Sequence, residues 1–480
     1  MENIEISIEF NPEIIQRIYS IIKEDPDYKP KPYRRGMLRI EQALEATSDT
    51  RALRLGDGIL EEAADLFTKQ FPRRKAIIVA DTNTYAAAGK RVEEALHKAN
   101  IEQESPFIFE SSTLHAEYSC VTELVECFKK CEAIPIAVGS GTINDLTKLA
   151  SHLVGKRYMC VATAASMDGY TAYGASIRAN DIKQLFPCVA PQAVLVDTDV
   201  ILQSPTKMTT SGYADLLAKM TAGADWIIAD WLGVEPIDEK AWKITQSGFH
   251  EALLLTEKAS VQDEHTTIAK LMEGLMLGGF AMQLVKTNRP ASGAEHLLSN
   301  FWELERRIKK TKAVSHGDLL SIGILAITAF YEWVVNASLE DLDIQKCCAN
   351  WPDAEEYERQ AKEAISEIGL NVCIQEAKAK YISREQLGIQ LQQLKEYWPE
   401  IRERLSQQLI PYREMKAKMK QIGLPTNPEE VGISRTHLRQ TFLCTQYMNR
   451  RFTVLDLALR TGYMNTWLNG LFGKGKIWEI

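Results

Sequence analysis

The sequence predicts an α/β domain followed by an all-helical domain, on three observations. At 480 residues the chain is too long for one hydrophobic core, because cores stop growing at about 250–300 residues. Short apolar runs alternate with amphipathic stretches from residue 73 to residue 199. Beyond Pro205, stretches rich in Ala, Leu, Glu and Lys replace those runs. We expect an N-terminal extension over residues 1–45, an α/β domain over 46–203 and a helical domain over 204–480.

The apolar runs are typical of buried parallel strands. Their sequences are KAIIVAD, PFIFE, IPIAVGSG, YMCVATAAS and AVLVDTD, and segments of helical length separate them. Strands that are covered on both faces are apolar along their whole length, as in a βαβ sheet. The first 45 residues show no clear period, since Pro26, Pro30 and Pro32 interrupt a basic stretch. We assign that extension no function.

The composition argues against several classes of protein. A net charge of -8 and a pI near 5.7 oppose attraction of the whole protein to a nucleic-acid backbone. The longest apolar run, residues 321–331, is shorter than the ~20 residues of a membrane span, and the N-terminus lacks signal-peptide features. The nine cysteines lack zinc-site spacing and indicate reduced thiols. We expect a soluble cytoplasmic protein without a membrane partner, and a homo-oligomer is compatible with the sequence.

A glycine turn directly follows one of the predicted strands. The run GSGTIND, residues 139–145, stands between an apolar strand and a helical stretch. Glycines at such a turn let backbone amides approach a ligand, and the helix N-terminus behind them favours a phosphate. A pyrophosphate site and a purely structural glycine bend both fit this pattern. Asp81, at the end of another run, suits either a ribose diol or a helix N-cap.

Asp215, His296 and His316 are candidate metal ligands. Two imidazoles and one carboxylate form a usual ligand set for a divalent catalytic metal that keeps an open position. By residue type alone each has a structural interpretation, because a lone His is more often a core or surface residue and a lone Asp more often a cap. The flanking sequences SGYADLLAK, SGAEHLLSNFWE and KAVSHGDLL favour the metal.

These stretches resemble the sn-glycerol-1-phosphate dehydrogenases, within the superfamily of iron-containing alcohol dehydrogenases and dehydroquinate synthases. The resemblance also includes VADTNTY, VGSGTINDLTKLASH, VATAASMDGYTAYGASI, VLVDTDVI and, weakly, RRFTVLDLALRTGY. It implies a Rossmann-like domain that binds NAD(H) or NADP(H), a helical domain that holds one divalent metal ion, and a substrate in the cleft between them. The implied metal is zinc or nickel, with iron as a further option, and the implied setting is phospholipid metabolism.

The resemblance also assigns roles to residues. Asp215, His296 and His316 match the family's metal ligands and form the implied catalytic centre, while the substrate would contact Asp168, Asp215 and Asn300. The implied reaction is the reversible NAD(P)H-linked reduction of glycerone phosphate to sn-glycerol 1-phosphate. The implied cofactor contacts are Asp81, Gly141, Thr142, Ile143, Asn144, Asp145, Thr163, Ser166 and Ala172.

Two positions depart from the family pattern. Asn300 stands where the family has a substrate-contacting His, one helical turn after His296. Asn forms hydrogen bonds but does not titrate near neutrality as His does, so this change bears on the substrate. Ala172 stands where the family favours a Ser near the nicotinamide, and the neighbouring Thr171 is a candidate substitute.

Other functions stay open at this point. One is a dehydrogenase of the same superfamily for another polyol or sugar phosphate. Another is a cyclase like dehydroquinate synthase, which usually has Glu as its first metal ligand where this chain has Asp215. A third is DNA binding, because residues 431–480 hold seven Lys/Arg against two Asp/Glu and loosely resemble a helix-turn-helix protein. Helices that simply close the metal domain explain the same stretch, and we favour that interpretation.

Overall fold

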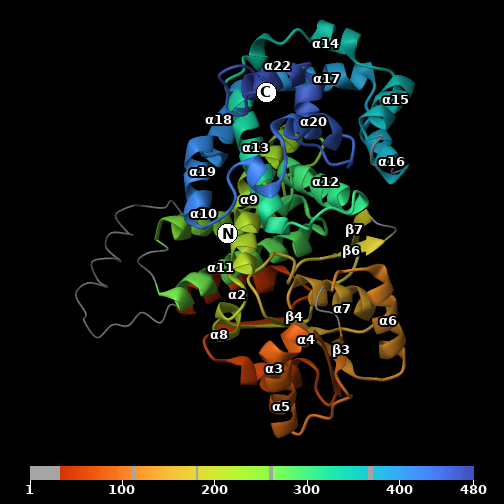
Figure 1. Cartoon of the computed structure of the whole chain (residues 1–480), viewed down its shortest axis with the longest axis vertical. Helices are drawn as coiled ribbons and strands as arrows, with labels where there is room; N and C mark the ends of the chain where they lie inside the picture. The colour runs from red at the N-terminus through yellow and green to blue at the C-terminus, as the bar shows by residue number, and fades with distance from the viewer. Residues whose placement is uncertain (1–32, 111–113, 180–181, 259–262, 366–370) are drawn as a thin grey trace, which may run out of the picture.

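The computed structural model describes residues 33–110, 114–179, 182–258, 263–365 and 371–480. It consists of an α/β half, red to yellow in Figure 1, and a helical half, green to blue. Six parallel strands form one sheet in the order β1-β8-β5-β4-β2-β3, which confirms the predicted fold class. These strands are β1 (Ala52–Gly56), β2 (Ala76–Asp81), β3 (Phe107–Phe109), β4 (Ile134–Gly139), β5 (Met159–Ala162) and β8 (Ala193–Asp197).

The carboxyl ends of the central strands meet at one edge of the sheet. Gly139 of β4 pairs with Ala162 of β5, and Ala162 pairs with Val196 of β8. All residues of these three strands are buried, as expected for strands that are covered on both faces. The segments that follow β4 and β5 therefore start side by side at the edge that faces the helical half.

Helices cover the sheet, and a small two-stranded hairpin is separate from it. The hairpin consists of the antiparallel strands β6 (Ala175–Ala179) and β7 (Ile182–Phe186) and reaches toward the helical half (Figure 1). The helices of this half are α2 (Tyr33–Ala46), α3 (Ala63–Gln70), α4 (Thr82–Thr84), α5 (Lys90–Lys98), α6 (Tyr118–Lys129), α7 (Gly141–Leu153) and α8 (Thr198–Leu202).

Three elements were not anticipated from the sequence. Each of the five apolar runs contains a strand, but β1 and the hairpin lie outside them. Residues 33–46, all but the last of which belong to the proposed extension, form α2, which packs on α11 with Ile40 and Ala43 buried in the core. The remainder of the extension, residues 1–32, lies outside the described residues.

The helical half follows α8 and consists of many packed helices. Its longest helices are α9 (Thr206–Trp231), α10 (Glu239–Lys258), α11 (Glu264–Val285), α12 (Ala294–Ile308) and α13 (His316–Val335). Helices α11 and α13 are long and apolar enough to cross a membrane, but 78% and 83% of their apolar windows are buried inside the protein. Such burial is typical of core helices.

The C-terminal helices pack into the same core. Leu438, Phe442, Leu455 and Trp467 are buried in one cluster with residues of α9, α12 and α13, so their apolar faces close the helical half. The shorter helices are α14 (Ile344–Asn350), α15 (Ala354–Ala364), α16 (Asn371–Lys380), α17 (Arg384–Glu396), α18 (Trp398–Gln408), α19 (Tyr412–Gln421), α20 (Arg435–Thr445), α21 (Val454–Arg460) and α22 (Met464–Phe472).

Candidate active site

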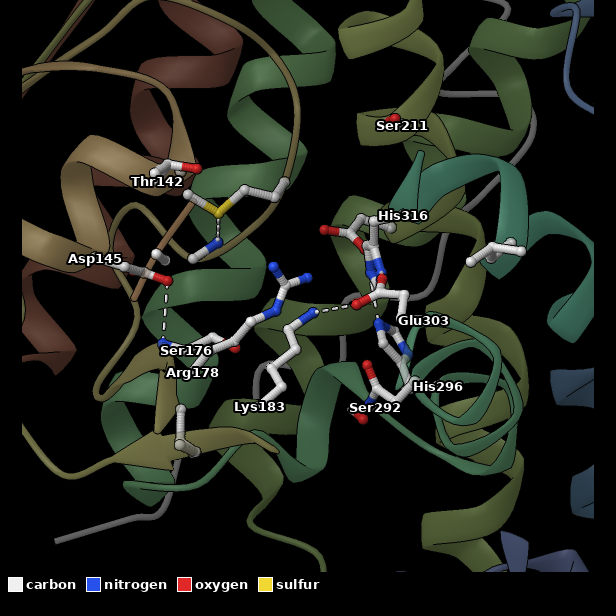
Figure 2. Close-up of a pocket in the computed structure, with 18 of the residues that line it drawn as sticks. Thr142, Asp145, Ser176, Arg178, Lys183, Ser211, Ser292, His296, Glu303 and His316 are labelled. Atoms are coloured by element: carbon white, nitrogen blue, oxygen red, sulfur yellow. Dashed lines mark hydrogen bonds and ion pairs between the residues drawn. The ribbon is translucent and has the colours of Figure 1, made fainter. Parts of the chain in front are cut away.

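A cleft of about 1360 Å³ lies between the two halves. The turns after β4 and β5 and the β6–β7 hairpin line one side of it, and the starts of α9, α12 and α13 line the other (Figure 2). Most residues singled out from the sequence line this cleft: Gly141, Thr142, Asp145, Ser166, Asp168, Ala172, Asp215, His296, Asn300 and His316.

The three candidate metal ligands converge on one point. Their ligand atoms all lie within 4.8 Å of one another, although they come from three different helices. His296 Nε2 and His316 Nε2 each lie 3.7 Å from Asp215 Oδ1. Asp215 is on α9, His296 is near the start of α12, and His316 is the first residue of α13. Residues up to 101 positions apart along the chain, Asp215 and His316, thus face the same volume.

A carboxylate supports each of the two imidazoles. Glu295 Oε1 lies 2.8 Å from His296 Nδ1, and Glu303 Oε1 lies 2.5 Å from His316 Nδ1. A proton that Nδ1 donates to a carboxylate fixes the tautomer, and the lone pair of Nε2 then faces Asp215. This is the arrangement in which histidines bind metal ions.

The electrostatics of the centre fit a cation. Asp215 Oδ1 is buried and has no hydrogen-bond partner among the described residues. Burial opposes the charge of Asp215, but the two imidazoles outweigh it and hold the pKa of this carboxyl well below its ordinary value. Burial and Lys183 oppose the imidazolium of His316, yet Glu303 and Asp215 outweigh them and raise its pKa to about 9. The side chains therefore favour positive charge between them and fit a divalent metal ion.

The glycine turn has a clear geometric basis. A Cβ on Gly139 would lie 2.5 Å from the Cβ of Ile143, so only glycine lets the strand turn sharply into α7. The helix begins at Gly141 without a side-chain cap, and Ser140, Gly141 and Thr142 line the cleft. An uncapped helix N-terminus that opens into a cleft suits a phosphate group.

Several proposed cofactor contacts do not reach the cleft with their side chains. Ile143 is fully buried in the core, and Asn144 Oδ1 accepts a hydrogen bond from Tyr158 at 3.0 Å. Thr163 is also buried and is not part of the cleft lining. Asp81 caps α4, where its Oδ1 accepts the backbone N–H groups of residues 83 and 84. The ribose role of Asp81 stays a prediction.

Two further side chains have structural partners. Asp145 lines the cleft, but its Oδ2 accepts the backbone N–H of Ser176 at 3.1 Å and thereby ties α7 to the hairpin. Thr171 is fully buried and donates to the carbonyl of Met276 at 2.7 Å, so it faces α11 and does not take the place of the family's Ser. The suggestion that Thr171 substitutes for that Ser was therefore wrong.

The two proposed substrate contacts lie beside the candidate metal ligands. Asp168 N donates to Asp215 Oδ2 at 3.2 Å, and Asp168 Oδ2 forms an ion pair with the buried ammonium of Lys219. Lys219 Nζ also donates to the carbonyl of Asp215 at 2.9 Å. Asn300 lines the cleft, and its buried Oδ1 lacks a hydrogen-bond partner among the described residues. Asp168 is therefore held in place, and Asn300 has an acceptor available for a ligand.

The hairpin contributes two basic side chains that the sequence did not single out. Arg178 and Lys183 point from the hairpin toward His316 and Glu303 (Figure 2). Lys183 Nζ lies 3.4 Å from Glu303 Oε2. The Arg178 guanidinium has one long ion pair, 3.9 Å to Glu117, and donates no hydrogen bond within the part of the chain that the structure describes.

Known proteins are similar to this chain in sequence. Residues 54–205 match the model of a family described as iron-containing alcohol dehydrogenase. A glycerol-1-phosphate dehydrogenase [NAD(P)+] from Halalkalibacterium halodurans is 34% identical over 257 residues, which cover 53% of this chain and 64% of that relative, a little under two thirds. The enzyme of the same name from Methanosarcina mazei is 33% identical over 278 residues, which cover 57% of this chain and 75% of the relative. The chain belongs to the glycerol-1-phosphate dehydrogenase family.

Two solved dehydrogenase structures share the fold. The glycerol dehydrogenase from Schizosaccharomyces pombe superimposes with a TM-score of 0.51 and 16% identity, covering 88% of this chain and 91% of that chain. The NADH-dependent butanol dehydrogenase A from Thermotoga maritima gives a TM-score of 0.54 and 15% identity, covering 88% and 96%. At these identities the likeness concerns the fold alone.

Proposed function

We propose that this protein uses NAD(P)H to reduce a small phosphorylated ketone, glycerone phosphate, at a metal centre formed by Asp215, His296 and His316. The observation that carries the proposal is the position of Arg178 and Lys183. Both line the same cleft as the candidate ligands and face them from the hairpin (Figure 2). A ketone at the metal centre would therefore have two cations beside it for a phosphate group.

Arg178 is well suited to bind a phosphate. Its side chain is 26% exposed and lacks hydrogen bonds to described residues, so its donors are available to a ligand. A guanidinium presents these donors in a planar fork that matches two phosphate oxygens at once. Lys183, 35% exposed, adds a second charge near the same place. The names of the relatives, glycerol-1-phosphate dehydrogenase, support the same substrate class.

The chemistry is divided between the bound metal and nucleotide, on one side, and the side chains of the protein, on the other. When bound, a divalent cation would polarise the ketone oxygen as a Lewis acid, and the nicotinamide would supply the hydride. The N-terminus of α7 would hold the pyrophosphate of the nucleotide at Gly141 and Thr142. Asp168, fixed by Lys219, would accept a hydrogen bond from the single hydroxyl of glycerone phosphate, and Asn300 would accept one from the second hydroxyl, which only the alcohol product carries. These contacts orient the ketone between the nucleotide and the metal centre.

The test compares a phosphorylated ketone with its parent compound. We expect Arg178→Met to lower kcat/KM for glycerone phosphate by about 10- to 100-fold, the range for a charge-assisted hydrogen bond, and to leave the activity on dihydroxyacetone unchanged. Arg450→Met is the matched control, because Arg450 also lines the cleft but its Nε lies 2.9 Å from Glu376. Equal losses on both ketones would contradict the phosphate role. Product formation without net NADH oxidation would instead indicate a cyclase.

A further inference from the structure

Glu303 joins the hairpin to one of the candidate metal ligands. Its Oε1 lies 2.5 Å from His316 Nδ1, and its Oε2 lies 3.4 Å from Lys183 Nζ. The Glu303 side chain is 14% exposed, so both contacts are largely shielded from water. One carboxylate therefore interacts at the same time with a metal-facing imidazole and with a cation of the proposed phosphate subsite (Figure 2).

The two partners of Glu303 belong to different halves of the protein. Lys183 is on β7, whereas Glu303 and His316 are on α12 and α13. The long Lys183 side chain is 35% exposed toward the cleft, and a flexible four-carbon stem lets an ammonium exchange partners easily. A phosphate group in the cleft and the Glu303 carboxylate would thus compete for the same ammonium.

We propose that Glu303 is a positioning residue that couples anion binding at Lys183 to metal binding at His316. The inference rests on the proposed function only in using Lys183 as part of an anion subsite. When an anion binds the ammonium of Lys183, Glu303 loses its ion pair with Lys183 and interacts with His316 alone. Without Lys183, the Glu303 carboxylate polarises Nδ1–H of His316 more strongly. Nε2 then becomes a better electron-pair donor, and the metal ion binds more tightly.

His296 provides an internal comparison for this proposal. Its carboxylate, Glu295, is fully buried and interacts with Thr221 Oγ1 at 2.8 Å and with Gly293 N at 2.6 Å. No lysine or arginine of the described cleft lining forms an ion pair with Glu295, whose partner there is His296. An anion in the cleft can therefore change the support of His316 while the support of His296 stays the same.

The experiment measures the mutual effect of an anion and a metal without turnover. Sulfate serves as the tetrahedral anion, and the dissociation constant of Zn²⁺ is measured by competition with a chromophoric chelator, with and without sulfate at constant ionic strength. We expect sulfate to tighten Zn²⁺ binding by about 5- to 10-fold in the wild type, and Zn²⁺ to tighten sulfate binding by the same factor, since coupling is reciprocal. The visible spectrum of the Co²⁺-loaded protein should shift when sulfate is added.

Three variants locate the coupling. Glu303→Gln and Lys183→Met, which alter the bridge from its two ends, should reduce the factor to less than about 2-fold. Arg450→Met should keep the wild-type factor, because the partner of Arg450 is Glu376. An unchanged factor in Glu303→Gln would overturn the proposal by showing that the coupling acts through space.

The outcome is independent of the identity of the ketone. The titrations contain neither ketone nor nucleotide, so intact coupling together with no reduction of glycerone phosphate would remove the proposed function and leave this inference standing. Reduction of glycerone phosphate without any effect of sulfate on Zn²⁺ affinity would remove this inference and leave the proposed function standing. If sulfate failed to bind the Zn²⁺-loaded protein, the anion subsite and the coupling would both be wrong.

Discussion

The two histidines of the candidate metal centre have the same partner type but different surroundings. Glu295, behind His296, is fully buried, and besides His296 its oxygens contact Thr221 and the backbone N–H of Gly293 among the described residues. Glu303, behind His316, is 14% exposed and shares its charge with Lys183 on the hairpin. The core thus fixes one ligand, whereas the substrate side of the cleft can influence the other.

The fixed side of the metal centre, formed by Glu295 and His296, is connected to the C-terminal segment. Asp225 accepts the backbone N–H of Ala294, at the start of α12, at 2.7 Å and that of Val454, at the start of α21, at 2.8 Å. The buried guanidinium of Arg289 donates to the carbonyls of Phe452 and Asp225 at 2.8 Å each. These bonds hold the start of α12, and with it Glu295 and His296, against the RRFTVL stretch. That stretch therefore contributes to the metal centre from a distance.

The largest effect is expected at the fixed side. Glu295→Gln should weaken Zn²⁺ binding by about 10- to 100-fold, because an amide is a weaker acceptor for Nδ1–H and its NH₂ group meets donors in a buried site. The loss should be the same with and without sulfate, in contrast to Glu303→Gln. Glu305→Gln is the control on the same helix, since Glu305 pairs with the distant His437. A Glu295→Gln loss that varied with sulfate would break the distinction between the two sides.

A smaller effect, on nucleotide affinity alone, is expected from a substitution in the α/β half. A Cβ on Gly141 would lie 3.0 Å from Met167 and beside the N-terminus of α7, so Gly141→Val should raise the dissociation constant of NADH about 10-fold or more. Zn²⁺ affinity should not change, because the metal centre belongs to the helical half. Fluorescence titration with NADH and the chelator assay check the two statements. Unchanged NADH affinity in a folded variant would contradict the loop assignment.

The smallest effect is expected at Asn300. Asn300→His should be tolerated and should keep kcat/KM on glycerone phosphate within about 3-fold or raise it, because the side chain faces the cleft one turn after His296. Steady-state kinetics with nickel and with zinc give the comparison. A large loss on the true substrate without any activity on glycerone phosphate would show that the pocket has changed its substrate.

The sequence was informative wherever a pattern is local. Continuous apolar runs mark buried strands, and all five of them contain one, because a strand covered on both faces needs apolar residues throughout. The edge strand β1 has an alternating burial pattern and gave no such run. The short hairpin was missed for a related reason, since its strands, ASIRA and IKQLF, mix polar with apolar residues and contain no continuous apolar run. The basic residues Arg178 and Lys183 were missed together with it.

At the site, the motifs located the residues but not all their contacts. Asp215, His296 and His316 meet because three helices pack together, which flanking motifs suggest but spacing alone does not show. Ile143 and Asn144 belong to the same motif as Gly141, yet their side chains point into the core. Glu303 follows His296 by two helical turns, so helical spacing places both on one face. That spacing was a signal that Glu303 lies near the metal centre, where it supports His316.

A metal ion at Asp215, His296 and His316 is the basis of the proposed chemistry, and one measurement tests for it directly. The metal content and Zn²⁺ and Ni²⁺ affinities of the wild type are compared with those of Asp215→Asn, with Asp230→Asn as a control at the far end of the same helix. We predict about one ion per wild-type chain and at least about 100-fold weaker binding in Asp215→Asn, because the neutral amide removes the only negative charge among the three ligands. The control should bind like the wild type. Equal affinities in the wild type and in a folded Asp215→Asn protein would contradict the metal centre.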